Sequence, residues 1–491
     1  MTDQLALGAA VLAATAAVVI SCLPQGRMVV ANRVATLLVF GVATAAVVSG
    51  LSSLAISPAR GPLDLAGLVF FAASTVVGAA SALVSPRYLR HSSVGFFRGG
   101  PRWYYLGIHL FWALLLAIPQ AANLGVAWIL IEASTGVTCL LVAYSGSRRA
   151  LEAGWKYLML TTFGLTVALL GILILYGSTA HAYGSAAHAG EALSALDWTS
   201  LHDTVRHLSP GTATVVVILV TVGLAAKIGW APIHHWLPDA HSEAPAPVSA
   251  MLSAALLPSI VLVVWRFDQS MGLAPTGAPH TLLLGFGLVS LVVSVPFLWT
   301  PLPVKRLLAY SSLEHMGIIA VGLGFAQPLA TAGVLLHVCG HAVAKSLGFY
   351  ATIPLFERQE GAAHRPLRGA VHASPQAATA LGISLGALSG LPPSPLFVSE
   401  LLILAGGIAA GQVVVAAVAA TLVALGFVGL AHQTIEGIFG KARAAHPVDA
   451  SSPAFWPLTA AGGAALVVLV GVAAWLATVP GWTALITRSL P

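Results

Sequence analysis

Charged side chains are scarce in this chain. Only 8% of its 491 residues are Asp, Glu, Lys or Arg, whereas soluble domains carry about 25%. Hydrophobic residues make up 58%, and the mean hydropathy is +0.90. We therefore expect most of the chain to lie in a lipid bilayer. The net charge of +6 comes from basic residues in short loops rather than in one patch, so nucleic acid is not an expected partner.

Cysteines and nucleotide-binding motifs are nearly absent as well. Cys22, Cys139 and Cys339 are scattered in apolar runs, without Cys-x-x-Cys or ferredoxin-like spacing. There is no Gly-x-Gly-x-x-Gly after a strand and no Walker A loop. No cofactor is predicted, and any redox chemistry would belong to another subunit. The first apolar run, from about Leu5, lacks the basic start and Ala-x-Ala exit of a cleavable signal peptide.

Long apolar runs recur along the chain, each long enough for a transmembrane helix. They predict an all-α polytopic membrane protein with about fourteen spans. The longest polar excursion, 178–210, and the stretch 355–375 are expected to be exposed loops. The predicted spans are 4–24, 30–51, 62–84, 104–121, 122–143, 155–177, 211–230, 247–266, 281–299, 303–325, 329–354, 376–404, 411–433 and 455–478.

Basic residues are distributed unevenly between the two sides of these spans. Sixteen of the 22 Lys and Arg residues lie in or next to loops on one side of the membrane. Four lie on the other side: Arg60, Arg206, Arg266 and Arg488. By the positive-inside rule the side with sixteen faces the cytoplasm. Both termini are then expected on the outer side of the cell (inner) membrane.

The segment KIGWAPIHHWLPDAHSEAPAPVS, residues 227–249, combines charges and prolines with an apolar surrounding. A charge inside a membrane span costs roughly 2.5–3.5 kcal/mol on insertion scales, so Lys227 is a functional candidate. Prolines such as Pro232 free backbone groups that lipid cannot satisfy. Helix 7 is therefore expected to be broken where it faces protein or water.

Helix 12 contains a second predicted break. In GLPPSPLFVSE, Pro392 and Pro393 precede the embedded Glu400. The two broken helices are five spans apart, and successive blocks of five spans have opposite orientations, which predicts two inverted repeats. By this symmetry Lys227 and Glu400 should occupy equivalent places. The predicted parts are N-terminal helices 1–103, a first repeat 104–266, a second repeat 267–435 and a C-terminal helix 436–491.

Further ionisable residues lie inside predicted spans. Glu132 in helix 5 is the expected partner of Lys227, and the two would titrate as one coupled unit. The alternative is a static salt bridge between two helices. His337, His341 and Lys345 in helix 11 are spaced four and four, which places them on one helix face. This stripe predicts a proton wire, because His changes charge near physiological pH, and Glu400 would end the path.

Other ionisable residues allow two interpretations. Glu314 and His315 in helix 10 could belong to the pathway or be structural partners. Three histidines follow the break in helix 7: His234, His235 and His241. They could be imagined with Asp239 as a metal site, but the prolines argue against preorganised ligands, and no metal is predicted. We expect them to border a hydrated cavity and relay protons, or to cap the broken helix.

These segments resemble a known family. KIGWAPIHHWLPDAHSEAPAPVSAMLSAALL is similar to the signature of the antiporter-like proton-translocating subunits of respiratory complex I, membrane-bound hydrogenases and multisubunit cation/proton antiporters. KRLLAYSSLEHMG, HAVAKSLGFY and GLPPSPLFVSE match further family segments in the same order. With LEAGWKYLML and the Glu132 helix, they are most similar to the hydrogenase-4 component F branch. The resemblance covers about residues 65–435.

The resemblance implies a fourteen-helix fold with two inverted repeats and a proton path along the membrane midplane. It implies pathway roles for Glu132, Lys227, His337, His341, Lys345 and Glu400. One position departs from the family: many members carry a Lys on helix 8 where this chain has Pro258, which cannot titrate. Ser253, Ser259 or water would have to bridge that gap.

The leading interpretation is a non-redox, proton-translocating subunit of a membrane oxidoreductase, hydrogenase- or formate-linked. Its expected partners are other membrane subunits and a peripheral redox arm with hydrogenase-like or iron–sulfur subunits. The alternative is a transporter without redox chemistry, either a cation/proton antiporter subunit or the proton-driven membrane subunit of an inorganic-carbon uptake system with a soluble partner. A third reading is a scaffold whose proton path has decayed.

Overall fold

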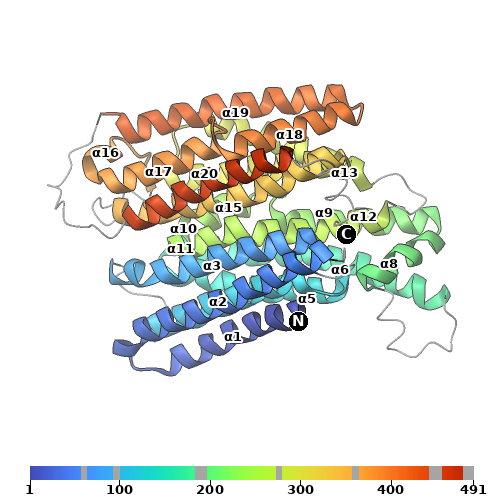
Figure 1. The fold of residues 1–491 in the computed structure, drawn as a ribbon, viewed down its shortest axis with the longest axis horizontal. Helices are drawn as coiled ribbons and strands as arrows, with labels where there is room; N and C mark the ends of the chain where they lie inside the picture. The colour runs from blue at the N-terminus through green and yellow to red at the C-terminus, as the bar shows by residue number, and fades with distance from the viewer. Residues whose placement is uncertain are drawn as a thin grey trace.

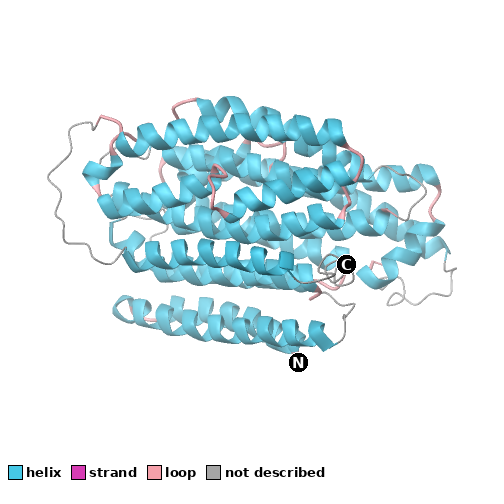
Figure 2. Cartoon of the chain, turned by 45° about the horizontal axis from the view of Figure 1, so that its top comes forward, coloured by secondary structure: helices cyan, strands magenta, loops and turns pink. Residues whose placement is uncertain are grey.

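The computed structural model describes residues 1–56, 63–91, 100–182, 196–272, 279–356, 364–441 and 456–478. In these residues the regular structure is helical, and two isolated bridges, Asn123 with Asp197 and Pro303 with Pro366, are the only β pairing (Figure 2). Twelve helices of the described residues are long and apolar enough to cross a membrane. The all-α, multi-pass class predicted from the sequence is confirmed.

The long helices carry most of the described chain. They are α1 (Thr2–Cys22), α2 (Gln25–Ile56), α3 (Leu65–His91), α5 (Leu124–Val142), α6 (Arg148–Ala182), α9 (Pro210–Ile228), α11 (Ala246–Met251) continued through a π-helix (Leu252–Leu256) into α12 (Leu257–Met271), α13 (Pro279–Trp299), α14 (Val304–Gly324), α15 (Pro328–Phe356), α19 (Val413–Phe439) and α20 (Trp456–Thr478).

Shorter helices lie between them. They are α4 (Pro101–Ala117), α8 (Trp198–Thr204), α10 (Trp236–Glu243), α16 (Ala370–Ala373), α17 (Pro375–Leu388), α18 (Pro395–Ala409) and the 3-10 turns Ile118–Gln120, Ala143–Ser145 and Val205–His207.

The twelve long apolar helices of the described residues are fewer than the fourteen predicted spans, and the count of fourteen stays a prediction. The run 104–121 forms α4, whose 17 residues continue into the 3-10 turn Ile118–Gln120. The run 376–404 is divided between α17 and α18. The predicted loop 178–210 is also partly helical, since α6 extends to Ala182 and α8 follows, while 183–195 lies outside the described residues. Apolar composition alone does not locate these ends.

The helices run side by side with their axes close to parallel (Figure 1). The apolar, membrane-length stretches of α11–α12 and α14 are entirely buried inside the protein, and most of the corresponding stretch of α15 is buried too. The stretches of α2, α19 and α20 are largely exposed, and α1, α2 and α19 lie at the margins of the bundle in Figure 1. Glu314, His315, His337, His341 and Lys345 on α14 and α15 therefore lie inside the protein rather than against lipid.

Both predicted breaks are present. The first separates α9 from α10, and the second separates α17 from α18. Each opens with a glycine in the left-handed region, Gly229 at φ 81° and Gly390 at φ 74°, where other residues are strained. Protein groups satisfy the freed backbone: the N–H of Ala231 donates to Ser290 Oγ at 3.0 Å, and Ser394 Oγ accepts from the N–H of Phe397 at 3.2 Å.

The two break charges do not occupy equivalent places. Lys227 lies two residues before Gly229, at the end of α9, whereas Glu400 lies ten residues after Gly390, within α18. The residue ten positions after Gly229 is Asp239. The expected correspondence of Lys227 with Glu400 is therefore wrong at the level of residues, because each break carries its charge on a different side.

Candidate functional site

Lys227 is fully buried and bound by hydroxyl groups from two helices. Its Nζ donates to Thr135 Oγ1 of α5 at 2.7 Å and to the Tyr157 hydroxyl of α6 at 2.5 Å. The ammonium also lies 4.3 Å from the centre of the Tyr157 ring, where the ring quadrupole favours a cation. Oxygens and an aromatic face thus replace the water that the ammonium loses on burial.

Glu132 meets Lys227 through a hydroxyl bridge rather than directly. No nitrogen–oxygen distance of 4 Å or less joins the two described side chains; instead Thr135 Oγ1, which accepts from Lys227, lies 3.5 Å from Glu132 Oε2. Thr162 Oγ1 donates to Glu132 Oε1 at 3.0 Å, and the carboxylate is half-buried. Because Thr135 is one turn from Glu132 on α5, it lies on the same face. The sequence predicted the pair but missed Thr135 and Tyr157. We call Glu132, Thr135, Tyr157, Thr162 and Lys227 the lysine cluster.

The histidines after the first break are separated. His234 and His235 stack on each other, with ring centres 4.8 Å apart, and His235 is exposed. His241 is fully buried between the rings of Trp236 and Phe349, at 6.5 and 5.8 Å. Both of its ring nitrogens lack a hydrogen-bond partner among the described residues. His234 is buried as well, with an Nδ1 that has no partner among the described residues, but His241 is the more deeply enclosed of the two.

Three buried histidines from two helices form a second cluster. His337 and His341 lie one turn apart on α15, and His315 of α14 packs against both, with ring centres 5.0 and 5.1 Å away. His315 Nδ1 lies 3.0 Å from His337 Nε2, and His337 Nδ1 lies 2.9 Å from Ser399 Oγ of α18. We call these three residues the histidine triad. His315, an uncertain member from sequence, is thus in direct contact with the predicted stripe.

Lys345 turns from this stripe toward α14. Its ammonium donates to the carbonyl oxygen of Leu308 at 2.6 Å and to Ser311 Oγ.

The two buried glutamates, Glu314 and Glu400, each face a glycine. A Cβ at Gly426 of α19 would lie 1.9 Å from Glu314 Oε1, and a Cβ at Gly390 would lie 2.8 Å from Glu400 Oε2. Glycine therefore leaves room for both carboxylates.

Pro258 leaves a backbone carbonyl free beside His341. It follows the π-helix Leu252–Leu256, in which the N–H of Leu257 donates to the carbonyl of Leu252, five residues back. The next such bond would run from residue 258 to Ser253, but proline has no N–H. His341 Nε2 lies 3.3 Å from that Ser253 carbonyl, and Ser253 Oγ lies 2.7 Å from Ser312 Oγ of α14. Ser253 thus contacts both His341 and Ser312, whereas Ser259 Oγ has no partner among the described residues.

Replacing Pro258 by alanine is expected to weaken the contact between Ser253 and His341. The alanine N–H can take the Ser253 carbonyl, so His341 loses its acceptor. We expect proton transport by the assembled complex to fall severalfold with little loss of thermal stability, since alanine also favours the helix. Proton uptake and the melting temperature of the purified protein check this, with Pro354→Ala of α15 as the control. Unchanged transport would show that the free carbonyl has no role in it.

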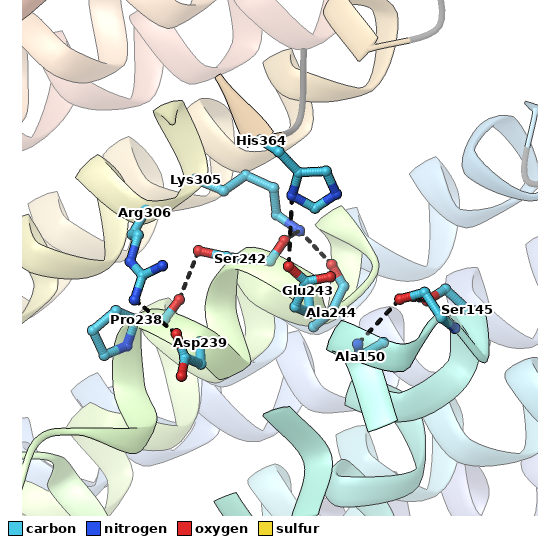
Figure 3. A network of polar contacts seen from close by, with 11 residues as sticks. Ser145, Ala150, Pro238, Asp239, Ser242, Glu243, Ala244, Lys305, Arg306 and His364 are labelled. Carbon is cyan, nitrogen blue, oxygen red and sulfur yellow. Dashed lines mark hydrogen bonds and ion pairs between the residues drawn. The ribbon is translucent and has the colours of Figure 1, made fainter. Parts of the chain in front are cut away.

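Ion pairs at one end of the bundle tie α10 to its neighbours (Figure 3). Asp239 accepts from Arg306 Nη2 at 2.8 Å and lies 3.4 Å from Lys156 Nζ, so it connects α10 with α14 and α6. Lys305, which is buried, donates to the carbonyl of Ser242 at 2.8 Å and to that of Ala244, at the C-terminal end of α10. The sequence analysis counted Lys305 only among the basic residues near a loop, because it lies at the start of the predicted span 303–325.

A second group of missed charges is buried elsewhere. Arg266 Nη2 lies 3.3 Å from Asp64 Oδ1, and Asp268 Oδ2 lies 2.8 Å from His280 Nδ1. Asp64 and Arg266 are far apart in the sequence, and neither local sequence pattern predicts that they form an ion pair. Only the packing of α12 against α3 brings them together.

Comparisons with known proteins agree on one family. The sequence profile of the family described as NADH:quinone oxidoreductase/Mrp antiporter, TM, matches residues 121–426, more than half of the chain. A hydrogenase-4 component F homolog of Methylacidiphilum infernorum is 32% identical over 387 residues, which cover 78% of this chain and 79% of the relative. NADH-quinone oxidoreductase subunit N 2 of Chloroherpeton thalassium is 30% identical, over 61% of this chain and 58% of the relative.

Solved structures share the fold over nearly the whole chain. A chain of the membrane-bound sulfane sulfur reductase, an archaeal respiratory membrane complex, matches with a TM-score of 0.82 and 18% identity, covering 99% of this chain and 96% of its own. A chain of respiratory complex I from Thermus thermophilus matches with 0.78 and 21% identity, covering 99% of both. A chain of the Mrp complex from Dietzia sp. matches with 0.74 and 18% identity, covering 99% and 97%.

Proposed function

Because this chain belongs to the NADH:quinone oxidoreductase/Mrp antiporter transmembrane family, whose members are antiporter-like membrane subunits, we propose that it moves protons as the non-redox subunit of a complex I-related oxidoreductase. A hydrogenase- or formate-linked partner would supply the energy. The relative named hydrogenase-4 component F homolog supports this type of complex.

The observation that carries the proposal is the hydroxyl bridge between Lys227 and Glu132. Thr135 accepts from Lys227 and approaches Glu132, so one side chain contacts both charged groups. A hydroxyl both donates and accepts, and can reverse its direction by rotation. A small displacement of α5 or α9 would therefore make or break the link between the two charges. Redox energy released in a partner would act on this link.

The histidine triad supports the next part of the path. Each neutral imidazole has one donor and one acceptor nitrogen, so His315, His337 and Ser399 form a connected row that ends beside Glu400. His241 occupies the interior between the two clusters, and its two partnerless nitrogens would serve a proton delivered through water. We propose Glu132, Lys227, His241, the triad, Lys345 and Glu400 as the pathway. His234 and His235 would support its entrance.

The arrangement in the membrane is part of the same proposal. The side with sixteen basic residues would face the cytoplasm, with both termini outward, in the cell (inner) membrane. Residues 104–266 and 267–435 would be the two inverted repeats, and Pro232, Pro392 and Pro393 would mark their breaks. The partners would be other membrane subunits and a peripheral redox arm.

The family description, which includes the Mrp antiporter, favours a second candidate. In that case the chain would exchange a cation for protons, or drive an inorganic-carbon uptake partner, without redox chemistry. Subunits that co-purify with the chain distinguish the two. Hydrogenase-like or iron–sulfur subunits support the first, whereas small antiporter subunits or a soluble uptake partner support the second.

Glu132→Gln tests the proposed function. We expect the complex in proteoliposomes to lose redox-driven proton uptake roughly 100-fold, which is within the range for a removed proton-transfer group, because glutamine cannot take a proton. Electron transfer by the partner subunits should remain measurable. Glu152→Gln is the matched control, since Glu152 is an exposed carboxylate of α6 paired with Lys156 at 2.6 Å. Equal pumping by both variants would contradict the proposal.

A further inference from the structure

The hydrogen bonds of the histidine triad fix which nitrogen of each ring carries a proton. Ser399 Oγ donates to the carbonyl of Leu396 at 2.7 Å, so it can only accept from His337 Nδ1. His337 Nε2 is then unprotonated and accepts from His315 Nδ1 at 3.0 Å. His341 Nε2 must donate to the Ser253 carbonyl, which has no proton to give. Each neutral ring is left with one unprotonated nitrogen.

Two of these nitrogens are buried without a partner. His315 Nε2 and His341 Nδ1 have no hydrogen-bond partner in the described part of the chain, and both rings are fully enclosed. A buried acceptor without a donor is unfavourable, so such groups usually indicate an unseen ligand or water. An unprotonated imidazole nitrogen is the form in which histidine binds a metal.

The three rings have the spacing of a metal site. One nitrogen from each lies within 4.8 Å of the others. Tetrahedral Zn²⁺ with Zn–N bonds of about 2.0–2.1 Å requires nitrogens about 3.4 Å apart. The two most distant nitrogens would need to approach each other by little more than about 1 Å, and side-chain rotation can supply this movement. His315 would then exchange its hydrogen bond to His337 for a bond to the metal.

We propose that His315, His337 and His341 bind one divalent transition-metal ion, with Zn²⁺ the best fit, and that the bound ion blocks proton transfer along α15. The blocking part rests on the proposed function; the binding part does not. Neutral imidazoles suit Zn²⁺ and its neighbours in the first transition series, and three protein ligands leave one position for water. The sequence analysis predicted no metal because it considered the histidines of the helix-7 break.

Groups around the triad support its orientation and charge. Ser399 and the Ser253 carbonyl hold the outward nitrogens of His337 and His341, and zinc-bound histidines commonly donate their other ring N–H to such an oxygen. Glu314 and Glu400, next to His315 and Ser399 in the chain, are buried in the same interior. The ammonium of Lys345 would repel a bound cation, but it is held by hydrogen bonds to the Leu308 carbonyl and Ser311 Oγ.

Titration of the purified full-length protein with Co²⁺ tests the site. We expect one ion per chain, with the visible absorption of tetrahedral cobalt, displaced by Zn²⁺. His337→Gln and His341→Gln should each weaken binding at least tenfold, and Ser399→Ala should weaken it about 10–100-fold. His432→Gln, at an exposed histidine of α19, is the control. Wild-type affinity in folded His337→Gln and His341→Gln would overturn the site.

Proton uptake in proteoliposomes tests the block separately. Zn²⁺ should inhibit the wild-type complex in proportion to occupancy of the cobalt-binding site. If the ion occupies the triad and proton uptake is unchanged, the block is overturned. If the wild-type complex moves no protons before metal is added, the proposed function fails, and the cobalt titration still decides whether the metal site exists.

Discussion

Replacing Lys227 by methionine is expected to abolish proton transport while the protein still folds. Methionine is close to lysine in length and cannot carry a proton, so the hydroxyl bridge to Glu132 loses its charged end. Thr135 and Tyr157 each lose a hydrogen bond to a charged group, worth about 1.5–3 kcal/mol, but keep their bonds to the Ile131 carbonyl and Thr138. Removing a buried charge offsets part of this cost. Redox-driven proton uptake should fall roughly 100-fold or more.

The control for Lys227→Met is Lys156→Met. Lys156 is a half-exposed lysine of α6 that pairs with Glu152 and Asp239. Its loss removes a surface contact worth about 0–1 kcal/mol and no buried charge. Lys227→Arg adds a second comparison, because it keeps a cation that does not deprotonate. Transport at the wild-type rate in Lys227→Met, with the same yield of assembled complex, would remove Lys227 from the pathway.

Gly426→Ala should reduce proton transport by displacing a carboxylate on another helix. The new Cβ would lie 1.9 Å from Glu314 Oε1, far inside van der Waals contact. The atoms nearest to this Cβ belong to the Glu314 side chain and not to a neighbouring backbone. The flexible end of Glu314 must therefore move, and α19 need not. We expect overpacking of about 1–3 kcal/mol, partly offset by the better helix propensity of alanine. Transport should fall to the level of Glu314→Gln, at least about tenfold below wild type.

The matched variant for this test is Gly437→Ala on the same helix. A Cβ at Gly437 would have only ordinary contacts with Leu367, the nearest at 3.7 Å. Gly437→Ala should therefore keep both stability and transport. If Gly426→Ala and Glu314→Gln both transport protons at the wild-type rate, Glu314 is a structural partner, which is the other reading that its sequence allows.

Much of the architecture follows from composition and local pattern. Apolar runs located the long helices, because a bilayer requires internally bonded apolar segments of nearly fixed length. The prolines of GWAP and GLPP located the two breaks, because proline removes a backbone donor and glycine tolerates a positive φ. The four-residue spacing of His337 and His341 placed them one turn apart on α15, as the structure does.

The same reasoning failed where the outcome depends on helix packing. The opposite charges of Lys227 and Glu132 inside two spans indicated a pair, but not that Thr135 would separate them. Local pattern also did not show that Pro258 leaves the Ser253 carbonyl free for His341, because that carbonyl depends on the π-helix.

By itself, the sequence determined that this protein is a helical membrane protein with buried lysine, glutamate and histidine residues and two interrupted helices. These properties follow from hydropathy, periodicity and proline, which act within one helix. Only the tertiary structure decided which charged groups meet, which hydroxyl links them, and that His315 completes a triad with His337 and His341. The physical reason is that hydrogen bonds and metal ligation act over about 2–3 Å, and only the packing of α14 against α15 sets such distances.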